Sequence, residues 1–477
     1  MKMIENDVIN KIFCVEDNPE ILDFKTIDGI PIWMMARYYL LYNILFARML
    51  DFHSPTRLRK LNFTTFFLLL KTIKHNVFHC DLKKDKEIIL YTTNRKTIVD
   101  SKFFNRYTDQ LALVFQENTV TIEQALLNWE WPFPRVNNCV YFDTICRIVG
   151  EIKSRFGSNK DIVQITALVE YVSNKAQEEC NISFSKEEKQ SFISYIAKLI
   201  ISMRHLANWI VKQTTPKAKL FVMVGGAYPF SYPINMLLKE KGIKTADLQH
   251  GYITKSNIMY NYSKSISNHP DVIRGLPDYF LTYGDYWNDQ FNFPNEKISL
   301  GNPYNDYCMK NVRFTSANNG SGKNRYITLF GTGENTDKYI LLTSLLQKQV
   351  SNFYKIKFRP HPGEKQFVLE YLLDNSIEID VDTNTEVYDT LKESDVVISE
   401  ISTVLFEAVG IVKRILVWQT DYSKAYFPDP PFETFTEMDD AVRLISDVNK
   451  SSNLDPNYFW ASEWKDNYKY FVRKIIK

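Results

Sequence analysis

Long apolar runs are missing from the sequence. No uninterrupted stretch reaches the roughly 18 apolar residues that suggest a membrane-spanning helix. The longest candidate, residues 30–50, is broken by Arg37, Asn43 and Arg48. The N-terminus, MKMIENDVINKIF, also lacks the apolar core of a secretory signal peptide. We therefore expect a cytoplasmic protein without a spanning helix.

Cysteine is scarce, and no two cysteines form a CxxC pair. This pattern disfavours both a zinc framework and a disulfide scaffold, and it predicts reduced, buried thiols. The six cysteines are Cys14, Cys80, Cys139, Cys146, Cys180 and Cys308.

Glycine, proline and net charge are low as well. The chain has 477 residues with 16 Gly and 18 Pro, and its 58 Lys and Arg nearly balance its 56 Asp and Glu, for a net charge of +2. Such a composition is typical of a globular protein and excludes a disordered or collagen-like chain. The near-neutral charge argues against broad nucleic-acid binding. The length exceeds what one core supports, so we expect two or more domains.

Residues 1–85 form the first region, which we expect to be mostly helical. Apolar residues recur at helical spacing from Ile32, and a second apolar run covers residues 63–73. Basic residues surround both runs. Such stripes usually pack against a neighbouring domain, which is the interpretation we favour. The alternative is a peripheral contact with the inner face of the cytoplasmic membrane through residues 30–75.

From residue 86 on, short apolar runs of β-forming residues alternate with helical segments. A polar segment with Asn-Asn-Gly-Ser-Gly, residues 311–325, separates two series of such runs and is typical of a linker. The first series covers 87–93, 220–226, 244–251, 278–284 and 297–303, and the second covers 327–334, 354–364, 377–381, 395–400 and 414–419.

This alternation predicts an α/β protein with two doubly wound, Rossmann-like domains and a cleft between them. The expected domains are residues 86–310 and 326–450, with a C-terminal helix in 451–477 that could pack back on the first domain. Parallel sheets of this kind bind ligands outside the carboxyl ends of their strands.

Three loops that follow strands of the second domain carry candidate ligand-binding residues. Gly331, Thr332, Gly333 and Glu334 form a loop that permits close backbone approach, although neither GxGxxG nor GxxxxGK[ST] is present. Arg359, His361, Pro362 and Glu364 belong to the next loop, where an Arg can grip phosphate and a His can donate to a phosphate or ribose oxygen. Ser399, Glu400, Ser402, Thr403 and Glu407 belong to the third.

Ser402 and Thr403 would lie at the start of a helix, where hydroxyls and unpaired backbone N–H groups suit a phosphate. Glu407, one turn further on, could bond a ribose. The alternative for the hydroxyls is ordinary helix capping, and for His361 a structural role in its loop.

These motifs together resemble bacterial GT-B glycosyltransferases of surface polysaccharide synthesis. His361-Pro362 matches the HP motif of the sialyltransferase-type enzymes that use CMP-activated sugars, and Ser402-Thr403 matches their S-S/T motif. The CDP-glycerol glycerophosphotransferases of teichoic acid synthesis are similar, and Ser399-Glu400 stands where they have Ser-Asp. The resemblance covers residues 246–418. It implies that the HP loop contacts a cytidine nucleotide and that the hydroxyl pair contacts its phosphate, so that residues 326–450 would hold the donor.

The first α/β domain would hold the acceptor. Its LQHG segment ends in His250-Gly251, which is similar to the His-Gly of the teichoic acid enzymes, whose His is taken as the catalytic base. The sialyltransferases carry an acidic pair before Gly, which this chain lacks. A neutral imidazole titrates near working pH and could remove a proton from an acceptor hydroxyl. The alternative is a His250 that bonds a neighbouring loop.

Further acceptor contacts are expected from Gln249, Arg106 and Asp109. For Arg106 and Asp109 a structural ion pair is the alternative that we favour. Asp380 and Asp382 form only a superficial DxD, so we expect no metal. The resemblance likewise implies no resident cofactor, only a nucleotide-activated sugar as co-substrate. Without a metal, a helix N-terminus, hydroxyls and Arg359 would stabilise the leaving group.

The sequence therefore predicts a glycosyltransferase that moves a sugar onto an oligosaccharide or lipid-linked acceptor of a growing bacterial surface glycan. A nonulosonate or ulosonate from a CMP donor is the favoured sugar, and a CDP-glycerol or polyol-phosphate transferase of teichoic-acid-like polymers is the close alternative. A UDP-sugar epimerase and a non-catalytic assembly scaffold are further alternatives. Only a scaffold would tolerate the replacement of His250.

Overall fold

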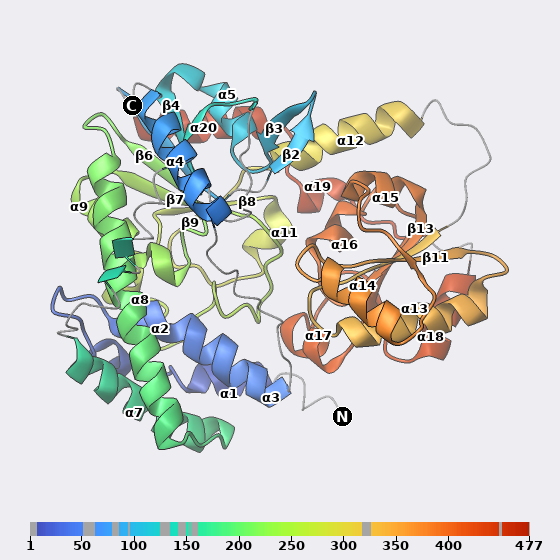
Figure 1. Cartoon of the computed structure of the whole chain (residues 1–477), viewed down its shortest axis with the longest axis horizontal. Coiled ribbons are helices and arrows are strands. Elements are labelled where there is room, and N and C mark those ends of the chain that lie inside the picture. The colour runs from blue at the N-terminus through green and yellow to red at the C-terminus, as the bar shows by residue number, and fades with distance from the viewer. Residues whose placement is uncertain are drawn as a thin grey trace.

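The computed structural model describes residues 7–50, 63–78, 85–93, 96–124, 134–141, 149–150, 152–153, 161–316, 326–447 and 451–476. Two parallel sheets dominate these residues, and Figure 1 shows them side by side with helices packed around each. The predicted fold class, two doubly wound α/β domains, is confirmed.

The first sheet has seven parallel strands in the order β5-β4-β1-β6-β7-β8-β9. Its central strands consist of buried apolar residues because helices cover both faces. The strands are β1 (Ile88–Thr92), β4 (Thr119–Glu123), β5 (Cys139–Val140), β6 (Leu220–Val224), β7 (Lys244–Leu248), β8 (Tyr279–Thr282) and β9 (Glu296–Ser299). A separate antiparallel hairpin, β2 (Lys96–Val99) and β3 (Lys102–Asn105), follows β1.

Helices from distant parts of the chain surround this sheet, some in contact with its strands and others packed on those helices. They are α5 (Asp109–Val114), η4 (Gln116–Asn118), α7 (Ile162–Cys180), α8 (Lys186–Gln213), η5 (Pro229–Ser231), α9 (Tyr232–Glu240), α10 (Pro270–Gly275) and α11 (Asp285–Asn288). The C-terminal helix α20 (Trp464–Ile476) also packs here, because Tyr468, Phe471 and Val472 share a core cluster with Leu90 and Leu248. A Glu188–Ser185 capping box starts α8.

The second sheet has six parallel strands in the order β12-β11-β10-β13-β14-β15. They are β10 (Tyr326–Phe330), β11 (Lys355–Arg359), β12 (Asp380–Val381), β13 (Ser394–Ser399), β14 (Arg414–Trp418) and β15 (Glu433–Phe435). The surrounding helices are α13 (Thr336–Val350), α14 (Lys365–Asp374), α15 (Val387–Glu393), α16 (Thr403–Glu407), α17 (Asp421–Tyr426) and α18 (Met438–Ser446).

Two segments connect the sheets: α12 (Pro303–Ser316) and the stretch around α19 (Pro456–Phe459). Helix α12 extends into the segment 311–325, whose first residues are therefore helical rather than linker. The physical reason is that the Asn- and Gly-rich part of this segment begins only at Asn318, and residues 311–316 contain neither Gly nor Pro.

The N-terminal region is helical. Its elements are α1 (Asp7–Cys14), η1 (Pro19–Leu22), α2 (Ile32–Tyr38), η2 (Tyr39–Phe46), α3 (Ala47–Leu50) and α4 (Phe63–Phe78). Helices α1 and α2 and the π-helical turn η2 belong to the largest core cluster, which buries Trp33, Leu41 and Phe46. Residues 30–50 are thus mostly core, as the favoured interpretation predicted, and they offer no apolar membrane face.

A buried ion pair fastens these helices to the first α/β domain. Arg37 lies 2.8 Å from the Glu16 carboxylate, and Trp33 Nε1 donates to the same group at 2.8 Å. The Arg37 guanidinium also donates to the carbonyl oxygens of Ile258 and Asn261. It therefore holds the long segment that follows β7.

The four described cysteines, Cys14, Cys139, Cys180 and Cys308, are unbridged, and Cys139 and Cys308 are buried. Cys80 and Cys146 lie outside the described residues. In the part of the chain that the structure describes, every helix is too short or too polar to cross a bilayer.

Candidate functional site

Each sheet has a point at which the chain reverses its direction of winding. In the second sheet this point lies between β10 and β13, which are neighbours although β11 and β12 come between them in sequence. Loops at the carboxyl ends of such strands form the ligand crevice of doubly wound sheets. The loops after β10, β11 and β13 are the three that carry the predicted donor residues.

The loops after β10 and β11 are joined through Glu364. Its carboxylate accepts hydrogen bonds from His361 N at 2.6 Å and from the Thr336 hydroxyl. A methyl group on Gly331 would lie only 2.4 Å from Glu364 Oε1, so any side chain there would displace this carboxylate. Burial raises the pKa of the Glu364 carboxyl. Glu364 therefore holds the two loops together from the inside, where its carboxylate is used by protein groups.

Glu400 joins the loops after β10 and β13 in the same way. It is completely buried and accepts hydrogen bonds from Asn335 Nδ2 at 2.7 Å, from Thr332 Oγ1 at 3.3 Å and from the Thr420 hydroxyl. Burial raises its pKa to about 7, although these three donors lower it. The preceding Ser399 is also buried, and its hydroxyl donates to Phe330 O at 2.8 Å.

The pKa of Glu400 predicts a pH-dependent stability. A carboxyl whose pKa rises on folding binds more protons in the folded state, so stability falls as pH rises from about 5 to 7. Glutamine cannot titrate, so Glu400→Gln should escape this loss. We expect the free energy of unfolding of the variant minus that of wild type to be up to about 3 kcal/mol higher at pH 8 than at pH 5. Urea denaturation at both pH values measures this, with the exposed Glu378→Gln as control. If the difference between variant and wild type is the same at both pH values, the raised pKa of Glu400 is contradicted.

His361, Ser402 and Thr403 are more accessible. His361 is exposed, and its Nδ1 accepts from Gly363 N at 3.2 Å, so the neutral ring carries its proton on Nε2 and can donate there. The half-buried Ser402 caps α16, because its hydroxyl accepts from Val404 N at 3.2 Å. Capping, the alternative interpretation of Ser402, is therefore present. Thr403 begins the helix beside it.

Arg359 differs from the expectation. Its guanidinium donates to Asp382 at 2.8 Å, to Thr390 Oγ1 at 2.9 Å and to Thr385 O at 2.6 Å. The pairing partner Asp382 is the second residue of the superficial DxD. In this conformation Arg359 therefore holds the segment 382–390 and is not directed at a phosphate.

The opposite wall comes from the first sheet, where β6 and β7 end side by side. Asp247, buried in β7, accepts from Gly225 N at 3.0 Å and Ala227 N at 2.8 Å, and burial raises its pKa to about 7. It thereby fixes the turn after β6. This turn places the Tyr228 hydroxyl 3.1 Å from His250 Nε2.

The contacts of His250 fit one neutral tautomer. Its Nδ1 lies 3.4 Å from the carbonyl oxygen of Leu248, which can only accept, so Nδ1 carries the proton. Nε2 then presents its lone pair and accepts from Tyr228. A lone pair of this kind is what a general base requires.

The two walls meet at these loops. A methyl group built on Gly251 would lie 4.0 Å from Thr403 Oγ1, so the residue after His250 faces the start of α16. Nearby, the Thr254 hydroxyl donates to Tyr426 O at 2.7 Å, which joins the same loop to α17. The structure thus brings together the predicted base and the predicted phosphate-binding hydroxyls, which are about 150 residues apart in sequence.

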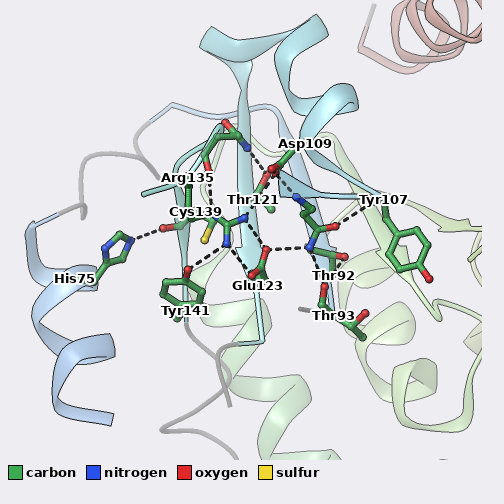
Figure 2. Close-up of polar contacts among 12 residues, drawn as sticks. His75, Thr92, Thr93, Tyr107, Asp109, Thr121, Glu123, Arg135, Cys139 and Tyr141 are labelled. Atoms are coloured by element: carbon green, nitrogen blue, oxygen red, sulfur yellow. Dashed lines mark hydrogen bonds and ion pairs between the residues drawn. The ribbon is translucent and has the colours of Figure 1, made fainter. Parts of the chain in front are cut away.

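Gln249 and Asp109 serve other purposes than acceptor binding. Gln249 is buried, donates to Gly251 O at 2.8 Å and accepts from Tyr283 N at 2.8 Å, so it holds its own loop. Asp109 is completely buried in a polar cluster (Figure 2), where its carboxylate accepts from Asn105 N at 2.8 Å and lies 3.8 Å from Arg135. Both expectations of direct acceptor contact are wrong for this reason.

The cluster of Figure 2 reaches His250 through a chain of hydrogen bonds. Arg135 pairs with Glu123 through two contacts of 2.8 Å, and Glu123 accepts from Asn105 Nδ2 at 3.0 Å. Asn105 Oδ1 accepts from Tyr107 N at 3.1 Å, and the Tyr107 hydroxyl donates to His250 O at 3.0 Å. The buried charges thereby support the loop that carries His250.

Arg106 pairs across the two domains and not with Asp109. It lies 2.8 Å from Glu386, which also accepts from the Tyr304 hydroxyl at 2.8 Å. Structural ion pairing is thus present for both Arg106 and Asp109, each with a different partner. The half-buried Glu407 lies near this pair, and burial raises its pKa to about 7 while Arg106 lowers it.

Three residues that contact the predicted site residues were not identified from the sequence: Tyr107, Tyr228 and Glu386. Each contacts a partner that lies far along the chain, His250 for the two tyrosines and Arg106 for Glu386. No local motif marks them, so only the assembled fold identifies them.

Comparisons with known proteins find similar architectures at low similarity. No protein-family model matches the sequence, and no curated protein matches it. The solved structures that it resembles include the UDP-GlcNAc 2-epimerase from Methanocaldococcus jannaschii in complex with UDP-GlcNAc and UDP, at 11% identity and a TM-score of 0.44, over 81% of this chain and 99% of that one.

Two further solved structures are similar over most of this chain. The wall teichoic acid polymerase TagF matches at 13% identity and a TM-score of 0.38, over 87% of this chain and 94% of that one. MurG from Acinetobacter baumannii matches at 7% identity and a TM-score of 0.38, over 82% and 99%. At these values the functional argument depends on the residues of this chain.

Proposed function

We propose that the protein is a glycosyltransferase that moves a sugar from a nucleotide donor onto a glycan acceptor. The observation that carries the proposal is the approach of the His250–Gly251 loop to Thr403 at the start of α16. A transfer reaction needs a base on the acceptor side and anion-binding groups on the donor side. The two must face each other in a site that excludes water.

In the proposed reaction, the donor nucleotide lies in the crevice formed by the loops after β10, β11 and β13. His361 Nε2–H, Ser402 and Thr403 contact its sugar and phosphate groups. His250 Nε2 takes the proton of the acceptor hydroxyl as that oxygen bonds to the anomeric carbon and the nucleotide phosphate leaves. The Tyr228 hydroxyl orients the imidazole. This hydroxyl must give up its hydrogen bond to Nε2 when the acceptor hydroxyl takes that place.

The proposed donor carries a cytidine nucleotide, and the favoured donor is a CMP-linked nonulosonate or ulosonate. This part of the proposal rests on the motifs His361-Pro362 and Ser402-Thr403. A polyol-phosphate transferase with a CDP donor is the second candidate, and the His-Gly at His250-Gly251 favours it. In that reaction the same base would deprotonate a polyol hydroxyl, which would attack phosphorus and not carbon.

Nucleotide binding tests this proposal. Ligand-observed NMR or thermal shift would compare CMP, CDP, UDP and GDP on wild type, His361→Ala and Ser402→Ala. We expect selective binding of CMP or CDP that each substitution weakens about tenfold, the usual effect of losing a hydrogen bond to a charged group. Ser351→Ala, at the opposite edge of the same sheet, is the control and should bind as wild type does.

Other outcomes distinguish the alternatives. A preference for UDP or GDP would contradict the cytidine donor. Binding of UDP-sugar with interconversion of its epimer would identify an epimerase. A protein that binds none of the four nucleotides, with or without acceptor glycan, would contradict the transferase and favour a scaffold.

A further inference from the structure

Helix α4 turns its apolar face outward. Phe67 is 61% exposed, Val77 65% and Phe78 73%, and Leu70 and Ile73 are also exposed. At 100° per residue these five side chains fall on one arc of the helix. Scattered exposed apolar residues are normal on protein surfaces, but a contiguous stripe indicates an interaction site.

Polar side chains of the same helix face the protein and anchor it there. His75 Nε2 bonds the carbonyl oxygen of Cys139 at 2.8 Å, as Figure 2 shows, and Asn76 bonds both the backbone N–H and the carbonyl of Tyr141. Thr72 is completely buried. The helix is thus held to the edge strand β5 by hydrogen bonds from its inward side, and the five apolar side chains named above are exposed on the other side.

The charged residues of α4 near its apolar face are all positive. Residues 63–78 contain no Asp or Glu, and the exposed Lys74 and Lys71 lie on the apolar arc and at its edge. The Lys74 ammonium lies 5.9 Å above the Phe78 ring. Over residues 51–84 the sequence has seven Lys or Arg against two Asp, while the whole chain carries only +2. The positive charge is therefore concentrated beside the apolar stripe.

We propose that the outer face of α4 binds the surface of an anionic lipid bilayer. Phe67, Leu70, Ile73, Val77 and Phe78 would enter the boundary between headgroups and acyl chains, and Lys71 and Lys74 would extend to the lipid phosphates. The helix lies along the surface and does not cross it, because 16 residues with two lysines are too short and too polar to span. The proposal is independent of the proposed transfer reaction.

An anionic bilayer fits this face better than a second protein does. The stripe lies on a single helix, and aromatic and aliphatic side chains alternate with lysines there. Such a mixture suits an interface whose apolar and negatively charged layers lie a few ångströms apart. It moves the expected membrane contact from residues 30–75 to residues 67–78, at the end of that range and just beyond it.

Vesicle flotation tests the proposal on the full chain. Vesicles of phosphatidylcholine with phosphatidylglycerol would be compared with phosphatidylcholine alone. We expect the wild type to float with the anionic vesicles, and F67E/V77E to bind about tenfold more weakly or not at all. K71E/K74E should bind at least about 25-fold more weakly, since each lysine near an anionic surface contributes about fivefold. The pair F353E/L373E is the control, because Phe353 and Leu373 are 75% and 80% exposed in the second domain.

Three results would overturn the proposal. One is wild type that does not float with anionic vesicles, and another is F67E/V77E that floats as well as wild type. The third is a wild type that is dimeric by light scattering and becomes monomeric in F67E/V77E, which would assign the face to a second copy of the chain. Circular dichroism checks that each variant is folded. We expect no unfolding, because the substituted side chains are already exposed.

Discussion

Replacement of His250 by Ala is expected to lower turnover about a thousandfold while the affinity for the donor nucleotide stays within a factor of two. General-base catalysis contributes roughly 10² to 10⁴ in rate, and His250 belongs to a loop of the first α/β domain and not to the donor loops. Turnover would be followed by release of the free nucleotide, and affinity by titration. Because the side chain is only half-buried and bonds just the Tyr228 hydroxyl and the Leu248 carbonyl in the contacts described above, the fold should survive.

Two further variants sharpen this test. Tyr228→Phe removes the hydroxyl that orients Nε2 and should lower turnover by about tenfold, with little change in nucleotide affinity. His269→Ala removes a histidine that caps α10 outside the site and should keep full turnover. Equal turnover of His250→Ala and wild type would contradict a catalytic role. An equal loss in His269→Ala would indicate that the effect is structural.

Replacement of Arg135 by Met is expected to destabilise the protein by about 3–5 kcal/mol. The substitution would leave Glu123 and Asp109 buried together with no cation between them, and breaking a buried ion pair from one side costs about that much. Burial already raises the pKa of Asp109 to about 7 with Arg135 in place, so the loss of Arg135 should favour its protonated form further. Urea denaturation followed by circular dichroism measures the change.

Arg443→Met is the matched control, because Arg443 pairs with Asp440 on the exposed surface of α18. A pair of this kind contributes well under 1 kcal/mol. The double variant R135M/E123L removes both charges of the closest pair and should recover part of the loss. A destabilisation below about 1 kcal/mol for Arg135→Met would contradict the buried cluster of Figure 2.

The order of strands and loops could be predicted from the sequence because the information is local. Buried parallel strands are short apolar runs, and the loops that follow them contain Gly, Pro, His, Ser and Thr. The loops after β7, β10, β11 and β13 were placed correctly for this reason. Strands β4, β5 and β15 and the hairpin β2–β3 were missed. Strand β4 contains Thr and Glu, β5 and β15 have only two and three residues, and the hairpin strands carry Lys, Thr and Asn.

The partners of the charged side chains could not be predicted. Arg359 was expected at a phosphate, but its partner Asp382 comes from a neighbouring strand end that only the sheet order brings close. Glu364 and Glu400 were expected at the ligand, yet both are buried because they fill the space between adjacent loops. A sequence motif thus indicates which loops form a site but not which side chains face its interior.

Hydrogen–deuterium exchange with and without saturating CMP tests the central claim most directly. The account predicts slower exchange in residues 330–335, 359–364 and 399–405, with a smaller effect in 249–252 on the facing loop. Protection confined to other segments would contradict the placement of the donor site, as would the absence of any protection with CMP, CDP, UDP and GDP in turn.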